Sequence, residues 1–140
     1  MKKLPIVEII LVILGSILYF AANIQRVAVP GAVFDLLQNY LHTTAQSVAD
    51  LGSYFMYIYA ASQLVIGVLI ARYGGFRVVT FGSILFFVGS LLFPFSQTLP
   101  LLYFSRVLIG LGSATFYLGM INETRRIVPK KNFGVVLSLI

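Results

Sequence analysis

Long stretches without a charged side chain constrain this sequence more than any other feature. Residues 51–71 contain no charged side chain, residues 78–95 contain none, and residues 9–25 form a third uncharged run. A helix of about 20 apolar residues is long enough to cross the hydrocarbon core of a bilayer. Hydrophobic residues make up 59% of the chain and charged residues only 10%. This composition excludes a soluble domain and predicts an integral membrane protein.

The apolar runs organise residues 1–140 as one domain of helices. We expect membrane helices at about 5–37, 51–71, 78–95 and 101–121, and the start of a fifth at 133–140. Pro94 and Pro100 bracket the turn between the third and fourth helices. Transmembrane strands would instead appear as segments of about ten residues with alternating hydrophobicity. The expected fold class is all-α, a polytopic membrane helix bundle.

The basic residues predict how the helices are oriented in the membrane. Eight of the ten Lys and Arg residues lie on one side of the predicted bundle, whereas the opposite turns at 38–50 and 94–100 contain none. Cytoplasmic loops accumulate Lys and Arg, so we expect a cytoplasmic N-terminus. Because apolar segments separate these charges, nucleic acid is not an expected partner. The eight are Lys2, Lys3, Arg72, Arg77, Arg125, Arg126, Lys130 and Lys131.

Reactive groups of the usual catalytic kinds are scarce in the sequence. It contains no cysteine and one histidine, which leaves no thiolate nucleophile and no zinc cluster. No carboxylate dyad lies within a predicted helix, and no nucleophile lies beside a base. We therefore expect neither an enzyme nor a bound metal or cofactor.

Arg26 is the most informative residue of the first predicted helix, because a charge in an apolar segment usually faces a cavity or a partner. Tyr19, Asn23 and Pro30 share its helical face at i, i+4, i+7 and i+11 spacing. A guanidinium stays protonated and binds carboxylate or phosphate through two parallel hydrogen bonds. This face therefore predicts an anion site. The alternative is that Arg26 extends to the lipid headgroups at the outer surface.

The second predicted helix carries Tyr59, Gln63 and Gly67 one turn apart. The amide of Gln63 would have no hydrogen-bond partner in lipid, so we expect it to face the bundle or a pore. The residues predicted to bind a substrate are Arg26, Asn23, Tyr19, Tyr59 and Gln63.

Arg106 is the other arginine inside a predicted membrane helix. Gly110, Ser113 and Tyr117 share its face, which is polar or small throughout. We therefore expect Arg106 to point into the bundle. Gly110 and Gly112 would also permit a neighbouring helix to approach closely.

The turn GVLIARYGGFR, residues 67–77, resembles a signature loop of the major facilitator superfamily of transporters. In the pattern G-x-x-x-D-R-x-G-x-R this chain supplies Gly67, Arg72, Gly74 or Gly75, and Arg77, but it has Ala71 at the acidic position. The resemblance implies a gating role for this loop, in which the acidic residue helps to hold two halves of the protein together. Ala71 cannot do this. Glu123 is a possible partner for basic residues of the loops, but we expect it to be a solvated charge.

Two further segments carry the same resemblance. SRVLIGLGSA is similar to the family's fourth-helix pattern R-x-x-x-G-x-G through Arg106, Gly110 and Gly112, which implies a role in proton coupling and conformational exchange. YFAANIQRVAVPGAVFDLL is similar to the first helix of facilitators that carry organic anions or phosphorylated solutes.

The resemblance covers the whole chain and implies the first four helices, and the start of a fifth, of a fold built from two six-helix halves. We expect a fragment of a secondary transporter, a symporter for a small anionic organic solute, in a bacterial cytoplasmic membrane. Its partners would be the solute, protons, the lipid bilayer and the missing C-terminal half. The alternative is a small self-assembling or accessory four-helix membrane protein without transport activity of its own.

Overall fold

The computed structural model describes residues 6–128 and 133–134, and every regular element in these ranges is helical. Four segments within them are long and apolar enough to cross a membrane, namely Val12–Ala32, Ala45–Tyr73, Gly75–Phe95 and Leu99–Ile127. The predicted fold class, an all-α polytopic helix bundle, is confirmed. The elements are α1 (Ile6–Val27), the π-helix η1 (Ala28–Ala32), α2 (Phe34–Tyr40), α3 (Ala45–Tyr73), α4 (Gly75–Phe95) and α5 (Leu99–Ile127).

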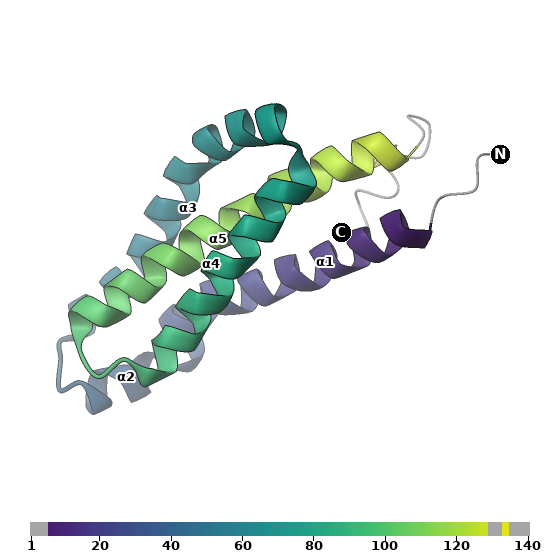
Figure 1. Ribbon diagram of the computed structural model, residues 1–140. Coiled ribbons are helices and arrows are strands. Elements are labelled where there is room, and N and C mark those ends of the chain that lie inside the picture. The colour runs from purple at the N-terminus through teal and green to yellow at the C-terminus, as the bar shows by residue number, and fades with distance from the viewer. Residues whose placement is uncertain (1–5, 129–132, 135–140) are drawn as a thin grey trace.

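Helix α5 is the central element, with α1, α3 and α4 packed around it (Figure 1). The difference in burial is large, because 56% of the apolar stretch of α5 is buried against 17% for each of the other three spans. Every other long helix therefore has a broad face left for lipid or for further helices.

Small residues bring α4 and α5 into direct backbone contact. Glycines recur every seven residues on α4, at Gly75, Gly82 and Gly89, and again on α5, at Gly112 and Gly119. A Cβ on Gly112 would lie only 2.5 Å from the carbonyl oxygen of Gly82. Small residues at such contacts allow membrane helices to pack closely where the hydrophobic effect no longer drives association.

The region predicted as a first helix at 5–37 is divided into three elements. Pro30 lacks an N–H group and interrupts the α-helical hydrogen bonds, and the chain continues as the π-helix η1. In η1 the N–H of Val33 donates to the carbonyl oxygen of Ala28, five residues earlier, at 2.9 Å. The short helix α2 then leads towards α3.

Two other helices are longer than their apolar runs. Helix α3 begins at Ala45, before the predicted start at 51, because the Thr44 hydroxyl accepts the Ser47 N–H at 3.2 Å and caps the helix. Helix α5 continues to Ile127, so residues 122–127 are helical rather than part of a loop. Apart from residues 133–134, the predicted fifth helix lies outside the described residues.

A single residue joins α3 to α4. Gly74 has a φ of +85°, a conformation that side-chain-bearing residues rarely adopt, and its N–H donates to the Ile70 carbonyl oxygen at 2.9 Å. The start of α1, this turn and the end of α5 lie at one end of the bundle, while α2 and the turn between α4 and α5 lie at the other (Figure 1). Four of the eight basic residues, Arg72, Arg77, Arg125 and Arg126, therefore share one end.

Candidate functional site

A small polar cavity lies between α1, α3 and α5. Four of the five residues predicted to bind a substrate line it, whereas Gln63 lies one turn beyond Tyr59 on α3, half-buried and outside the lining. The cavity offers about 20 Å³ to the centre of a water molecule, and a bound water needs roughly 10–15 Å³ on this measure. It therefore has room for about one water, so it would form only one side of a solute site and does not enclose one. The lining residues are Tyr19, Ala22, Asn23, Arg26, Phe55, Tyr59 and Ser113.

Helix α1 brings Tyr19, Asn23 and Arg26 to the cavity, together with Ala22, because these residues recur on one helical face. The Asn23 side-chain amide donates to the Tyr19 carbonyl oxygen at 3.0 Å, which holds Asn23 against its own helix. The Arg26 side chain is exposed. No carboxylate of the described residues lies within ion-pair distance of it, so its charge is open to a ligand.

Arg26 also borders a wider and more open pocket of about 540 Å³ on the side of η1. Pro30, Gly52 and Tyr57 line this second pocket with Arg26. The guanidinium therefore lies between the small inner cavity and this larger outer pocket. A solute in the outer pocket could reach it.

Aromatic rings line the inner cavity or lie directly beside it. The rings of Tyr19 and Tyr117 lie 5.6 Å apart between centroids, and those of Phe55 and Tyr59 lie 6.1 Å apart and stack at 21°. Tyr117 was not among the residues predicted to bind a substrate. Its spacing of four residues from Ser113, a lining residue, was a signal in the sequence that could have identified it.

Arg106 lies behind this cavity and is completely buried. Its Nη1 donates to the carbonyl oxygen of Gln25 on α1 at 3.0 Å, and the guanidinium lies 4.7 Å from the ring centroid of Phe93 and 5.9 Å from that of Phe55. Among the described residues, no partner accepts a hydrogen bond from its Nε or Nη2. Arg106 contacts α1 but does not line the cavity.

The two glycines grouped with Arg106 lie at helix contacts. A Cβ on Gly110 would lie 3.2 Å from the Phe55 carbonyl oxygen on α3, whereas Gly112 faces α4. Both positions therefore permit close helix packing, which is compatible with the coupling role that the sequence motif implies.

The residues of the predicted gating loop lie at the end of the bundle, away from the cavity. Arg72 and Arg77 are exposed, and the Arg72 guanidinium lies 5.4 Å from the centroid of the Tyr73 ring. Gly74 forms the one-residue turn. Gly67 faces open space, with nothing within 4 Å of a Cβ built on it.

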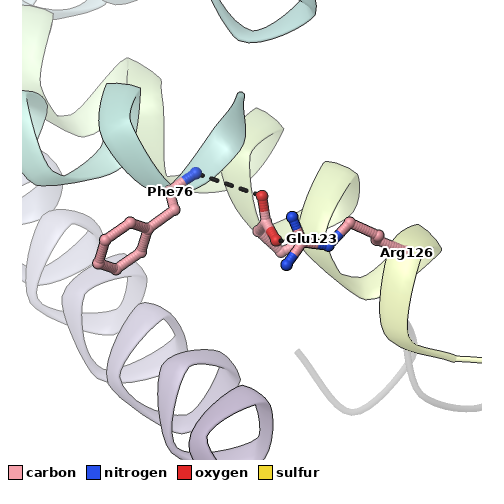
Figure 2. Close-up of polar contacts among 3 residues, drawn as sticks. All are labelled: Phe76, Glu123 and Arg126. Atoms are coloured by element: carbon pink, nitrogen blue, oxygen red, sulfur yellow. Dashed lines mark hydrogen bonds and ion pairs between the residues drawn. The ribbon is translucent and has the colours of Figure 1, made fainter. Parts of the chain in front are cut away.

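Glu123 is not the solvated charge that we expected. Its side chain is only 13% exposed, and Figure 2 shows it between the start of α4 and Arg126. Oε1 accepts the Phe76 N–H at 3.2 Å, and Oε2 lies 3.6 Å from Arg126 Nε. The first N–H groups of a helix have no partner within it and favour a negative charge. A carboxylate therefore lies beside the turn between α3 and α4 although position 71 is alanine.

These features define a multi-pass membrane protein with an arginine in a polar cavity between its helices. The sequence profile of the Major Facilitator Superfamily matches residues 11–140. The chain belongs to this family, whose members are transporters.

A curated relative agrees with this assignment. The uncharacterized transporter YybO of Bacillus subtilis (strain 168) is 32% identical over 115 residues. The match covers 82% of this chain but only 26% of YybO, so the chain spans about a quarter of that protein's length. No solved structure gives a significant match.

Proposed function

We propose that this chain contributes to a secondary transporter that moves a small anionic organic solute by alternating access. The observation that carries this proposal is the convergence of Arg26, Asn23, Tyr19 and Tyr59 on one cavity. Such a charge within a membrane helix is costly unless it faces a cavity or a partner. In a family of transporters, an arginine that has no ion-pair partner among the described residues, and that lies beside tyrosines and an amide, fits an anionic solute better than a neutral one.

The chemistry of the cavity favours a carboxylate or phosphate group. The Arg26 guanidinium would bind it through two parallel hydrogen bonds. Asn23 and the tyrosine hydroxyls can both donate and accept hydrogen bonds, while the aromatic rings provide apolar walls for the body of the solute. Because the inner cavity holds about one water, further helices of the transporter would have to complete the site.

The arrangement in the membrane follows from the basic residues at one end of the bundle. We infer that this end, with the N-terminus, faces the cytoplasm, because cytoplasmic loops accumulate Lys and Arg. Within the same proposal the protein lies in a bacterial cytoplasmic membrane, a C-terminal half completes it, and protons are the coupling ions of a symporter.

Ligand binding to the purified chain in lipid nanodiscs tests the anionic solute. The probes are D-gluconate and glycerol 3-phosphate, with glycerol as the neutral control, and calorimetry gives Kd. We expect Arg26→Gln to weaken binding of the anionic probe that the parent binds by about 10- to 100-fold, since a hydrogen bond to a charged group contributes roughly 1.5–3 kcal/mol. Arg72→Gln makes the same change of charge at an exposed turn and should leave Kd unchanged.

Two results would contradict the proposal. If glycerol binds as well as the anions do, the site is not an anion site. If Arg26→Gln and Arg72→Gln behave alike, Arg26 extends to the headgroups instead of facing a ligand.

A further inference from the structure

The two spaces beside Arg26 differ greatly in size. The inner cavity has room for about one water, whereas the outer pocket has a volume of about 540 Å³ on the same measure. A small organic anion is larger than several waters, so only the outer pocket has room for its body. Arg26 lines both spaces. An anion bound to the guanidinium would therefore extend into the outer pocket, which residues of α1, η1, α2 and α3 form.

The walls of the outer pocket are mostly apolar. Val27, Pro30, Phe34 and Met56 contribute aliphatic, aromatic and thioether groups to its lining. Contact with such groups removes apolar surface of a solute from water, which is favourable. A methionine side chain is also flexible, and its sulfur makes favourable contacts with aromatic rings. These walls therefore suit a solute with an apolar body.

Few polar groups in this pocket are left for a solute rich in hydroxyl groups. Apart from Arg26, the lining side chains that carry a polar atom are Ser53 and Tyr57. The Ser53 hydroxyl donates to the Ala49 carbonyl oxygen of its own helix at 3.3 Å. Tyr57 is 73% exposed, and its hydroxyl remains as a partner. A polyol bound against these walls would lose water from several hydroxyl groups without gaining enough partners, which is unfavourable.

Gly52 lines the outer pocket on α3, opposite Pro30. A Cβ built on Gly52 would lie 3.7 Å from Cδ of Pro30, which is an ordinary contact distance. Alanine at position 52 would therefore fit without moving η1, whereas a longer side chain would extend past Pro30 into the pocket. The size of residue 52 thus limits the size of the body that the pocket accepts.

We propose that the outer pocket binds the body of the solute and selects a carboxylate or phosphate monoester attached to an aromatic ring. Arg26 binds the anionic group, the ring lies against the apolar walls that include Pro30 and Met56, and Gly52 is a specificity-determining residue. This inference rests on the proposed function, to which it adds the class of solute.

Two phosphate monoesters of similar size and equal charge test this class. Phenyl phosphate carries an aromatic ring and glycerol 3-phosphate carries a diol, while phenol is the neutral control for partition into lipid. Calorimetry with the full chain in lipid nanodiscs gives Kd, after subtraction of the heats from empty nanodiscs. Phenyl phosphate should bind at least about tenfold more tightly than glycerol 3-phosphate, because its ring removes more apolar surface from water. Phenol should bind more weakly than phenyl phosphate.

Substitutions in the pocket separate recognition of the ring from recognition of the anion. Gly52→Leu should weaken binding of phenyl phosphate by about tenfold, because the leucine side chain occupies the place of the ring. Gly67→Leu is the same change at an open position of α3 and should leave Kd unchanged. Met56→Gln keeps a similar volume but makes the wall polar, and should reduce the preference for phenyl phosphate by about threefold. If Gly52→Leu cannot be purified in folded form, Met56→Gln decides.

The outcomes separate this inference from the proposed function. If phenyl phosphate does not bind, or binds no more tightly than glycerol 3-phosphate, the aromatic class is wrong and the proposed function stands. If Gly52→Leu and Met56→Gln both leave the preference unchanged, the ring does not lie in the outer pocket. If phenol binds as tightly as phenyl phosphate, or if Arg26→Gln leaves the binding of phosphates unchanged, the anion site fails and the proposed function fails with it.

Discussion

The two faces of α5 are built in opposite ways. Towards α4, glycines such as Gly82 and Gly112 bring the two backbones into contact. Towards α1, polar and aromatic side chains such as Arg26 and Ser113 border a cavity that they do not fill. Close packing stabilises a helix pair, whereas a polar cavity leaves interactions available for a ligand. The comparison assigns stability to the α4 face and binding to the α1 face.

The largest effect on stability should come from Gly112→Ala. The added Cβ would lie 2.5 Å from a carbonyl oxygen and 2.6 Å from the Phe86 nitrogen, both backbone atoms that cannot move independently. Overpacking of this kind costs about 3 kcal/mol. We expect a lower midpoint of thermal unfolding, measured by circular dichroism in detergent.

The matched control for this change is Gly67→Ala on α3, where a Cβ meets open space. Alanine inside a helix is more favourable than glycine by roughly 0.5–1 kcal/mol, so the midpoint should stay the same or rise. Equal unfolding midpoints for the two variants would contradict the contrast between the two faces of α5, because close contact with α4 would then contribute nothing to stability.

An intermediate effect is expected at the end of the α4 face. Glu123→Ala removes the acceptor for the Phe76 N–H and should cost about 1 kcal/mol, as the loss of a helix cap does. Arg126→Ala should change stability by less than about 0.5 kcal/mol, since the Arg126 side chain is 67% exposed and exposed ion pairs are weak. Equal losses in thermal unfolding would show that the ion pair, rather than the cap, stabilises this end.

The smallest effect should come from Arg26→Gln. The side chain is exposed and lies beside a cavity, so we expect a change within about 0.5 kcal/mol in the same unfolding experiment. A small change in stability, together with loss of anion binding, would support the assignment of binding to the α1 face and of stability to the α4 face. A large fall in the midpoint would show instead that the α1 face also stabilises the fold.

The sequence predicted the fold class because the length of the apolar runs, and the need to hydrogen-bond every backbone group, leave few alternatives in a membrane. The burial of Arg106 likewise follows from the small residues that share its helical face. The division of the first span was not predicted. A proline such as Pro30 interrupts α-helical hydrogen bonds, but the choice of a π-helix depends on how α1 packs against the other helices.

Contacts between helices account for the other differences. Glu123 was expected to be solvated, and only the position of α4 brings the Phe76 N–H beside it. Tyr117 lies against the ring of Tyr19, a cavity-lining residue, because α1 packs on α5. Helical periodicity shows which residues share a face, but it does not show which face of a neighbouring helix they meet.

The one-residue connection at Gly74 has a consequence for the rotation of α4 about its own axis. Successive residues of an α-helix are turned by about 100°. The Ile70 carbonyl accepts the Gly74 N–H. Because the turn is a single residue, it could not absorb an extra residue inserted between Ile70 and Gly75. The insertion would turn the row of glycines on α4 away from α5. Chain length at this turn therefore determines which side of α4 faces the centre of the bundle.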